Sequence, residues 1–444
     1  MINITIIGTG YVGSVTGACL ADFGNKVICI DNNQEKITSF QKGIVPFFEP
    51  GLDEIINRNI RSNRLVFSTD LVSAIKTSDV VFIAVGTPSL GDGSADLSFV
   101  KFVSQEIARY MEKHLIIVNK STVPVGTGKK VILWVDEELK KNNRTFSFDV
   151  LSNPEFLREG SAVYDFMHPD RVVLGSESNK AISVLKDVYR PLYLNETPFI
   201  ETNLETAEMI KYASNAFLAT KITFINEIAN LCEKTGANVQ DVARAIGRDG
   251  RIGSKFLHPG PGYGGSCFPK DTRALAKIAR DLNQPVTIIE AVISANEYQK
   301  KRQADKIESI MSGNNSLIGK TISILGLSFK TNTNDMREAP SLTICEQLIK
   351  KGANLRVYDP VSMDEAKIYL KEFKDSIYYA VDEYDTLIGS DALVIITEWN
   401  QFRTLDLLKV KENLKNSPYI FDLRNIYNRE DIEAVGLKYY STGR

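Results

Sequence analysis

The fold is decided by one stretch near the start of the chain, Ile2-Asn3-Ile4-Thr5-Ile6-Ile7-Gly8-Thr9-Gly10-Tyr11-Val12-Gly13. Its first six residues predict a short buried strand, and the glycines that follow predict a tight turn that opens a helix. Gly8 permits the turn, Gly10 lets the backbone approach a pyrophosphate, and Gly13 allows the helix and the strand to pack closely. The N–H groups and the positive dipole of the helix N-terminus then face the phosphates. The stretch therefore predicts a dinucleotide-binding βαβ unit.

An acidic residue, Asp31, follows at the end of the next predicted strand. A carboxylate at this position accepts hydrogen bonds from the adenosine ribose and repels the 2′-phosphate of NADP. The glycine pattern alone would also fit an ordinary glycine-rich turn, but the strand, the helix and the acid together favour a cofactor site. We therefore predict that the cofactor is NAD.

Beyond this unit, short apolar runs alternate with amphipathic stretches, which is typical of a parallel sheet covered by helices. The strands expected in the N-terminal part are 2–7, 26–30, 80–85, 115–119 and 148–151. After Gly319 the pattern restarts, and the elements expected there are strands at 321–325, 355–358, 392–397 and 419–423 and a helix at 341–351. The predicted fold class is α/β, with an N-terminal Rossmann-type NAD domain, a central long-helix domain and a smaller C-terminal Rossmann-like domain.

The central part has no strand signal. Residues 202–205 have the Thr-x-x-Glu form of a capping box, and no Gly or Pro follows until Gly236. A single helix over 204–235 is expected, roughly 50 Å long at ~1.5 Å per residue. Such a helix links domains or packs against a second subunit, so we expect a homodimer. The predicted domains are 1–200, 201–300 and 312–444, with Gly/Pro-rich loops at 43–51 and 250–265 and a linker at 312–316.

The composition excludes several classes of protein. Hydrophobic residues make up 43% of the 444 residues and charged residues 24%, close to the globular averages of ~45% and ~25%, so disorder is excluded. The net charge of −2 provides no basic field for nucleic acid or an anionic membrane. Residues 1–21 lack the basic start of a signal peptide and are too polar for a spanning helix. The five cysteines have no short spacing and fit a reducing compartment, so a soluble cytoplasmic protein is expected.

Cys267 has the most informative surroundings of the five cysteines. It lies in Gly264-Gly265-Ser266-Cys267-Phe268-Pro269-Lys270-Asp271, just before a helical run at 272–280, and Pro269 suits a first helical turn. A helix N-terminus and the neighbouring Lys270 both stabilise a thiolate. We therefore predict a reactive nucleophile at Cys267. The simpler interpretation, a buried structural cysteine, is kept for the other four, Cys19, Cys29, Cys232 and Cys345.

Three further groups of polar residues stand out. Lys211 and Asn215 share one face of the long helix, although ordinary surface residues would also fit that spacing. Residues 153–160, Asn-Pro-Glu-Phe-Leu-Arg-Glu-Gly, follow a strand, and Lys120-Ser121-Thr122-Val123-Pro124 ends another. Open α/β sheets place their ligand sites at such strand ends. The three histidines show no ligand spacing, and we expect no metal.

Taken together, these motifs resemble the UDP-glucose/GDP-mannose dehydrogenase family. The resemblance spans nearly the whole chain, and the block around Cys267 is its most specific part. It rests on the motifs at 8–13, 120–124, 153–160 and 264–271, on Lys211 with Asn215, on Arg251-Ile252-Gly253, and on Phe329-Lys330 followed by Asp335-Met336-Arg337-Glu338.

The resemblance implies an activity. Members of this family oxidise the primary alcohol of a nucleotide sugar to a carboxylate, a four-electron oxidation that consumes two NAD. By the family pattern the Cys267 thiolate attacks the aldehyde to give a thiohemiacetal, which becomes a thioester that water hydrolyses. Lys211 would stabilise charge on oxygen and Asn215 would donate a hydrogen bond to the same oxygen. The remaining catalytic roles fall to Asp271 and Thr122, which would position a water or proton relay, and to Glu155, which would serve thioester hydrolysis.

The resemblance also implies binding residues. The expected cofactor contacts are Gly8, Gly10, Tyr11, Val12, Gly13, Asp31, Lys36, Thr87, Thr122, Glu159, Lys270 and Arg337. The expected substrate contacts are Glu155, Phe156, Leu157, Arg158, Glu159, Lys211, Asn215, Arg251, Phe256, Leu257, His258, Pro259, Gly260, Gly264, Lys330 and Arg424. In such enzymes Arg251 reaches the sugar site of a neighbouring subunit, which agrees with the expected homodimer.

Several alternatives stay open. Arg251-Ile252-Gly253 and Phe268 resemble the branch of the family that oxidises UDP-glucose, so UDP-glucose is the expected substrate and GDP-mannose the alternative. A two-electron NAD dehydrogenase with a merely structural Cys267 is a second alternative. A nucleotide-binding protein without catalysis is a third.

Overall fold

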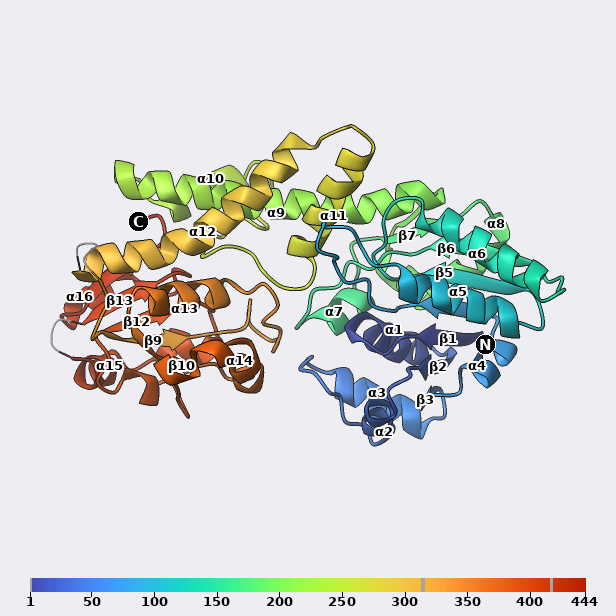
Figure 1. Cartoon of the computed structure of the whole chain (residues 1–444), viewed down its shortest axis with the longest axis horizontal. Coiled ribbons are helices and arrows are strands. Elements are labelled where there is room, and N and C mark those ends of the chain that lie inside the picture. Colours follow the sequence, from blue (N-terminus) through green and yellow to red (C-terminus); the bar gives the residue numbers. More distant parts are fainter. Residues whose placement is uncertain (1, 313–315, 416–417) are drawn as a thin grey trace. The chain divides into compact units, whose positions relative to one another are not determined.

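The structure is a computed structural model that describes residues 2–312, 316–415 and 418–444. The chain divides into two compact units, Met1–Ser214 and Asn215–Arg444. Figure 1 labels many of the helices and strands of both units. The predicted division into three domains stays a prediction.

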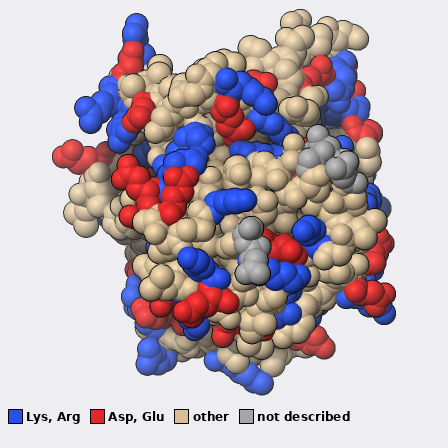
Figure 2. Space-filling view, turned by 90° about the vertical axis from the view of Figure 1, so that its left-hand side faces the viewer, with Lys and Arg blue, Asp and Glu red and all other residues tan. Residues whose placement is uncertain are grey.

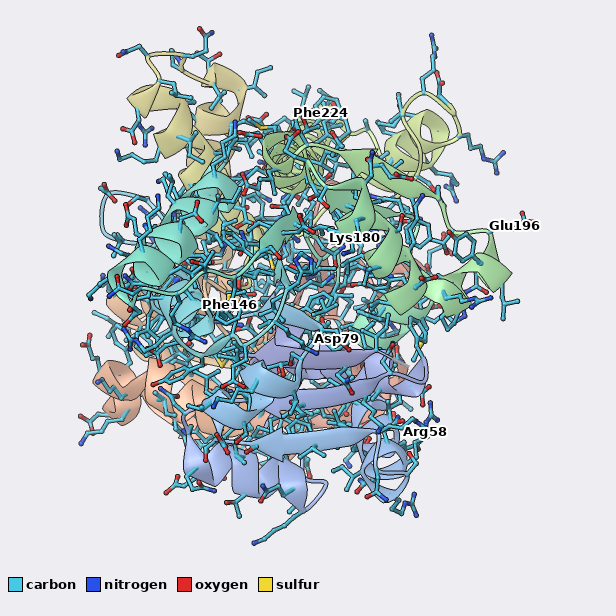
Figure 3. The ribbon with its side chains drawn as sticks, turned by 90° about the vertical axis from the view of Figure 1, so that its right-hand side faces the viewer. Arg58, Asp79, Phe146, Lys180, Glu196 and Phe224 are labelled. Carbon is cyan, nitrogen blue, oxygen red and sulfur yellow. The ribbon has the colours of Figure 1, made fainter. Side chains whose placement is uncertain are left out.

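The N-terminal unit is built on an eight-stranded sheet with the order β3-β2-β1-β4-β5-β6-β7-β8. Its strands are β1 (Asn3–Ile7), β2 (Lys26–Ile30), β3 (Leu65–Ser68), β4 (Val80–Ile83), β5 (Leu115–Asn119), β6 (Phe148–Ser152), β7 (Val172–Gly175) and β8 (Phe199–Thr202). Neighbouring strands pair in parallel, except that β6 and β7 pair antiparallel. Asp79, labelled in Figure 3, fixes the start of β4 against β1 by accepting the N–H of Asn3 at 3.0 Å.

Helices cover both faces of this sheet. They are α1 (Tyr11–Asp22), α2 (Gln34–Gln41), α3 (Leu52–Arg61), α4 (Leu71–Thr77), α5 (Ser98–Tyr110), α6 (Thr127–Lys141), α7 (Ala162–Met167) and α8 (Asn179–Val188), with a 3-10 turn η1 (Arg190–Asn195). On β4, Val80 and Phe82 join the core under α1, α2 and α3, whereas Val81 and Ile83 join the core under α5 and α6. Because successive side chains of a strand point to opposite faces of the sheet, β4 contributes to two separate apolar cores.

The helix α9 (Leu204–Thr235) contains the boundary between the two units. Its range confirms the helix predicted at 204–235. The predicted capping box was wrong, because Thr202 is the last residue of β8 and the side chain of Asn203 accepts the N–H of Thr206 at 2.8 Å instead. An Asn side chain satisfies an orphan N–H of the first turn as well as Thr does.

The C-terminal unit contains the rest of α9, a group of helices that precedes a second sheet, and that sheet with its own helices. The helices before the sheet are α10 (Val239–Gly247), α11 (Phe268–Asp281) and α12 (Thr287–Ser312). The sheet has the order β11-β10-β9-β12-β13-β14, and all its strands are parallel. Residues 313–315 of the predicted linker at 312–316 lie outside the described residues. The region 250–265 has no regular element, as predicted.

The second sheet repeats the strand order of the first six strands of the N-terminal sheet. Its strands are β9 (Thr321–Leu325), β10 (Asn354–Tyr358), β11 (Ile377–Tyr379), β12 (Ala392–Ile395), β13 (Tyr419–Asp422) and β14 (Lys438–Ser441). Its helices are α13 (Pro340–Lys350), α14 (Met363–Tyr369), α15 (Leu407–Asn413) and α16 (Arg429–Ala434), with the 3-10 turns η2 (Lys371–Ser376), η3 (Asp385–Leu387) and η4 (Asn400–Thr404). The predicted α/β fold class is confirmed.

The sequence missed five strands, and four of them share one property. β3, β8, β11 and β14 are the edge strands of the two sheets. Edge strands are short and half exposed, so they lack the continuous apolar run of a central strand; Val66 in β3 and Ile200 in β8 are exposed. The fifth, β7, is buried but only four residues long.

Charged side chains of both signs lie on the surface (Figure 2). Basic and acidic side chains are interspersed on the face shown in Figure 2, as expected for a net charge of −2. Among the described residues, no helix has the length and apolar composition needed to cross a membrane.

Asp359 follows β10 and holds the second sheet together from inside. Its buried carboxylate accepts N–H groups from the turn after β9 (Leu327, 2.7 Å; Ser328, 3.0 Å), from its own turn (Val361 and Ser362, both 3.0 Å) and from Trp399 (Nε1, 3.1 Å). A carboxylate is an acceptor at every lone pair, and therefore it suits a position that is surrounded by donors.

We predict that Asp359→Asn destabilises the C-terminal unit by at least about 2 kcal/mol, because the amide N–H₂ would face donors that are then left unsatisfied. Urea unfolding followed by Trp399 fluorescence in a Trp134→Phe background measures this. The matched control is Asp406→Asn at the N-terminus of α15, where the side chain accepts the N–H groups of Leu408 and Lys409. Asn caps helices as well as Asp does, so the control should keep its stability; equal stability of the two variants would contradict the role of Asp359.

Candidate active site

The glycine-rich turn after β1 has the geometry of a phosphate cradle. Gly8 has φ +101°, and a Cβ at Gly13 would lie 1.8 Å from the carbonyl oxygen of Gly8. At Gly10, in contrast, an added Cβ meets no heavy atom of the described chain within 4 Å. Gly10 is the N-cap of α1, and within the described residues no side chain caps this helix and no acid lies in its first turn. The first N–H groups of α1 are thus available to an anion.

Asp31 completes this cradle at the end of β2. Its Oδ2 accepts the N–H (3.0 Å) and the hydroxyl (2.8 Å) of Thr9 and pairs with the Lys36 ammonium at 3.0 Å. Burial opposes ionisation, but the hydrogen bonds from Lys36, Thr9 and Asn33 outweigh it and hold the pKa of Asp31 below its usual value. An ionised acid beside a phosphate cradle fits the ribose of NAD and disfavours a 2′-phosphate.

The segment 153–160 is joined to the cradle by a residue that the sequence analysis missed. Both the hydroxyl of Tyr11 and the carboxylate of Glu49 accept the N–H of Gly160, at 2.7 and 2.6 Å, and Glu49 also accepts the N–H of Ala162 at 2.7 Å. Glu49 itself accepts the Tyr11 hydroxyl hydrogen bond. The only signal in the sequence was that Glu49 is an acidic residue within the Gly/Pro-rich loop predicted at 43–51. The loops after β4 and β5 are joined as well, because the Thr87 hydroxyl donates to the carbonyl of Thr122 at 2.8 Å.

Lys211 and Glu155 form a buried ion pair. The Lys211 Nζ lies 2.9 Å from Glu155 Oε1, and the two side chains are only 4% and 5% exposed. The other carboxylate oxygen accepts the N–H of Leu157 at 2.6 Å. Burial works against ionisation, but the Lys211 ammonium, the hydrogen bonds and the Lys120 charge together hold the pKa of Glu155 below its usual value. The helix α9 thus supplies a cation that keeps a buried carboxylate charged at the end of β6.

Two more cations lie near this pair. The guanidinium of Arg171 lies 3.6 Å from the ring centroid of Phe156, and the Lys211 Nζ lies 5.4 Å from the same centroid. Lys120 is buried behind the pair, where it donates to Asn153 Oδ1 at 3.0 Å and to the Tyr189 hydroxyl at 3.3 Å. Burial lowers the pKa of Lys120 to about 8. The motif at 120–124 drew attention to Lys120, whereas nothing in the sequence indicated Arg171.

In the C-terminal unit, Cys267 is the N-cap residue of α11. All five cysteines lie in the described residues; four are buried, and Cys267 is partly exposed. Burial raises the pKa of the thiols of Cys19, Cys29 and Cys345, the last to about 12, so these stay protonated. The four cysteines predicted to be structural are thus buried, and Cys267 differs from them in being partly exposed.

The residues around Cys267 form a charged cluster. The buried carboxylate of Asp271, one turn further along α11, accepts the Asn215 amide at 2.6 Å and pairs with the ammonium of Lys270. The N–H of Asp271 donates to the carbonyl of Cys267 at 2.8 Å. The structure therefore brings together Lys270 and the three residues of this unit that the sequence named as catalytic, Cys267, Asp271 and Asn215.

The loop before Cys267 packs against the predicted nucleotide-binding residues. A Cβ at Gly264 would lie 2.5 Å from the carbonyl oxygen of Glu338, and Gly265, with φ +82°, lies against the ring of Phe329. The N–H of Gly265 donates to the carbonyl of Arg337 at 2.8 Å. Lys330 lies 5.4 Å above the Phe329 ring. These glycines allow two segments that are distant in sequence to come into direct contact.

Arg424 joins the same region. A Cβ at Gly260 would lie 3.0 Å from its Nη1, and the guanidinium donates to the carbonyls of Ile396 (2.7 Å) and Phe329 (3.3 Å). It also pairs with Glu398 at 3.0 Å. The loop 256–260, the segment after β9 and Arg424 are thus gathered at one place in the C-terminal unit.

The other predicted residues lie as follows. Arg158 pairs with Asp165 (2.6 Å), and Arg251 is 90% exposed and pairs with Asp249 (2.6 Å) on its own loop. Phe256 lies in the left-handed region (φ +66°) with its ring 6.2 Å from that of Phe268, Leu257 and Pro259 are buried, and His258 is exposed. Val12 lies in the first turn of α1, and Leu157 and Glu159 lie in the loop between β6 and α7. Among the described residues, no group of three or more His, Cys, Asp and Glu could hold a metal ion.

The cradle and the ionised acid at the end of the parallel strand β2 define the class: this is a dinucleotide-binding protein built on Rossmann-type sheets, with the features of an NAD site. Three models of one family match the chain, for the NAD binding domain at residues 2–193, the central domain at 205–298 and the UDP binding domain at 323–429. The chain belongs to the UDP-glucose/GDP-mannose dehydrogenase family. The resemblance found in the sequence and the prediction of NAD are therefore confirmed.

Individual relatives agree over the full length. The chain is 50% identical over 445 residues to the UDP-glucose 6-dehydrogenase of Rhizobium meliloti (strain 1021), covering 100% of this chain and 99% of that protein. It is 49% identical over 444 residues to the UDP-glucose 6-dehydrogenase TuaD of Bacillus subtilis (strain 168), covering 100% and 94%. Among solved structures it is similar to a UDP-glucose dehydrogenase from Pyrobaculum islandicum, with a TM-score of 0.90, 36% identity and coverage of 100% and 98%.

We predict that Gly10→Ala and Gly13→Ala fail in different ways. The Gly10 methyl group meets open space in the protein but occupies the path of the pyrophosphate, so Gly10→Ala should keep its melting temperature and lose roughly tenfold or more in NAD affinity. The Gly13 methyl group would collide with the Gly8 carbonyl, so Gly13→Ala should destabilise the unit by several kcal/mol, on the order of 3.

Calorimetric titration with NAD and thermal unfolding separate the two effects. Gly91→Ala is the matched control, because its Cβ also meets no heavy atom of the described residues within 4 Å. It should leave both stability and affinity unchanged. Unchanged NAD affinity in Gly10→Ala would show that the glycine-rich turn does not bind the pyrophosphate of NAD.

Proposed function

We propose that this protein oxidises UDP-glucose to UDP-glucuronate with two NAD per sugar, and that Cys267 holds the half-oxidised sugar covalently. The observation that carries the proposal is the position of Cys267, partly exposed at the N-terminus of α11 with Lys270 and Asp271 in the same turn. Its support from relatives is that two proteins about half identical over the full length are UDP-glucose 6-dehydrogenases.

The cofactor would be held by the residues that the family pattern names. They are Gly8, Gly10, Tyr11, Val12, Gly13, Asp31, Lys36, Thr87, Thr122 and Glu159 of the N-terminal unit and Lys270 and Arg337 of the C-terminal unit. NAD supplies the acceptor for one hydride, or two electrons, so oxidation of an alcohol to a carboxylate requires two. The protein must therefore retain the intermediate aldehyde between the two oxidations.

A cysteine explains the retention. The Cys267 thiolate attacks the aldehyde carbon, a C–S bond forms, and the carbonyl oxygen takes up a proton to give a thiohemiacetal. Loss of the C–H hydride to the second NAD, together with loss of the hydroxyl proton, would then leave a thioester. Water then adds to the thioester carbon, the C–S bond breaks, the sulfur leaves as thiolate, and the sugar carboxylate is released. The helix N-terminus and Lys270 favour the thiolate form on which these steps depend.

The buried charged groups would stabilise negative charge on the oxygen atoms of these intermediates and accept protons from water. Lys211 and Asn215, one turn apart on α9, offer an ammonium and an amide to a developing oxyanion. Glu155 is held ionised by Lys211 and can accept a proton from the attacking water. Asp271, oriented by Asn215 and Lys270, would position a water together with Thr122.

A second copy of the chain would complete the enzyme. Phe217, Phe224 and Leu231 are exposed on α9 at spacings of seven residues, so they lie on one face of the helix. Phe224 is labelled in Figure 3. We propose that this face forms a homodimer and that the exposed Arg251 serves the sugar site of the neighbouring subunit. A reactive thiolate also requires a reducing compartment, so we place the enzyme in the cytoplasm.

The proposal predicts two NADH per UDP-glucose and no turnover of GDP-mannose by the purified protein, measured at 340 nm under limiting sugar. Cys267→Ser should lower kcat for uronate formation by a factor on the order of a thousand or more, because an alkoxide is far harder to form than a thiolate. Cys345→Ala, in a buried structural position, is the control and should keep two NADH per sugar.

One NADH per sugar, or a Cys267→Ser variant with ordinary kcat, would identify a two-electron dehydrogenase instead. Faster turnover of GDP-mannose than of UDP-glucose would move the protein to the other branch of the family. If no nucleotide sugar gave any NADH, the protein would be a nucleotide-binding protein without catalytic activity.

A further inference from the structure

Asn119, the last residue of β5, has a buried amide without a protein partner. The residue is 2% exposed, and within residues 2–312, 316–415 and 418–444 neither its Nδ2 nor its Oδ1 makes a hydrogen bond. Its backbone carbonyl, in contrast, accepts the N–H of Asn153 at 2.9 Å. Buried amides that lack a protein partner are generally satisfied by an ordered water, because leaving them unpaired is costly.

The side chain lines a small cavity that has room for such a water. The cavity encloses about 10 Å³, and its polar walls include Asn119, Thr122, Ser152, Glu208 and Lys211. A single water requires about this volume and two to four polar partners. An unpaired amide and a one-water cavity thus occur at the same place.

Glu208 faces this cavity from α9. Its carboxylate is 3% exposed and accepts the N–H groups of Gly126 (2.6 Å) and Gly128 (2.7 Å) at the start of α6, with the Ser152 hydroxyl 3.4 Å away. Burial raises the pKa of this carboxyl to about 7. Each carboxylate oxygen has two lone pairs, so both oxygens keep a site for a further donor after these bonds.

We propose that one water molecule occupies this cavity and bridges the Asn119 amide and the Glu208 carboxyl. Water suits the site better than a cation, because Lys211, itself a cation, lines the same cavity. The bridge would fasten the end of β5 to α9 one turn before Lys211. Asn119 and Glu208 are therefore positioning residues that act through Lys211.

The catalytic consequence rests on the proposed function. The Lys211 ammonium donates to Glu155 at 2.9 Å. A water in the adjoining cavity limits where the ammonium can lie, and misplacement of a catalytic group by even about 1 Å can cost on the order of a hundredfold in rate. Since Asn119 does not recognise the sugar, its loss should affect kcat and leave KM nearly unchanged.

The test compares Asn119→Leu, which is of similar size but cannot bind water, with Asn119→Ser, whose hydroxyl leaves room for a replacement water. High-resolution crystal structures should show a water bridging Asn119 and Glu208 in the parent, none in the Leu variant and water again in the Ser variant. With UDP-glucose, Asn119→Leu should lose about tenfold or more in kcat with KM within about twofold, and Asn119→Ser should recover most of kcat.

Thr16→Val is the matched control, since it removes a buried hydroxyl that also has no partner in the described residues. It should leave kcat unchanged. A dry cavity in the parent crystals overturns the proposal. So does an Asn119→Leu variant that melts higher and keeps its kcat, which is the behaviour of a truly unpaired amide. The crystallographic result does not depend on the substrate, so a failure of the proposed function would be seen separately.

Discussion

A buried pair of opposite charges, Lys211 and Glu155, fixes the first turns of α9 in the N-terminal unit. Moving both charges out of water is costly, and the loss of one partner from such a pair costs about 3–5 kcal/mol because the other is left uncompensated. The first turns of α9 must therefore stay docked at the end of β6, with Lys211 Nζ 2.9 Å from Glu155. The same constraint keeps a carboxylate ionised in a buried place. Glu208, one turn earlier on α9, strengthens the docking through the N-terminus of α6.

The two sheets use one topology for different purposes. In both, an acid follows the second strand, Asp31 after β2 and Asp359 after β10. Asp31 keeps a partly exposed side chain and fixes only one residue of the glycine-rich turn, Thr9, so it can serve a ligand. Asp359 is buried and accepts hydrogen bonds from three separate segments. An acid at this point of a Rossmann-type sheet is thus suited to a cofactor where its side chain stays partly exposed, as in Asp31, and not where it is buried among donors from several segments, as in Asp359.

What the sequence can predict follows from how local each feature is. The cradle, Asp31 and Cys267 belong to short motifs whose glycines, helix starts and charges lie within a few residues, so the sequence alone predicts them as parts of a site. The central strands are predictable because they are buried on both faces, and the edge strands were missed because they are not. Glu49, Arg171 and Glu208 could not be recognised as parts of the site, because their partners lie far away in sequence: Glu49 contacts Gly160, and Glu208 contacts Gly126. Only the tertiary fold creates these pairs.

The most direct measurement is intact-protein and peptide mass spectrometry of Glu155→Gln after incubation with UDP-glucose and NAD. The amide keeps the shape of the side chain but cannot take a proton from water, and so thioester hydrolysis should stall. Because the amide also leaves Lys211 without its counter-charge, thermal unfolding is measured first to establish that the variant is folded at the assay temperature. The predicted result is a sugar nucleotide attached to the peptide that contains Cys267, absent from a Glu155→Gln, Cys267→Ser double variant. Full turnover with an unmodified Cys267, or a label on another residue, would contradict a covalent cysteine intermediate that depends on the buried carboxylate.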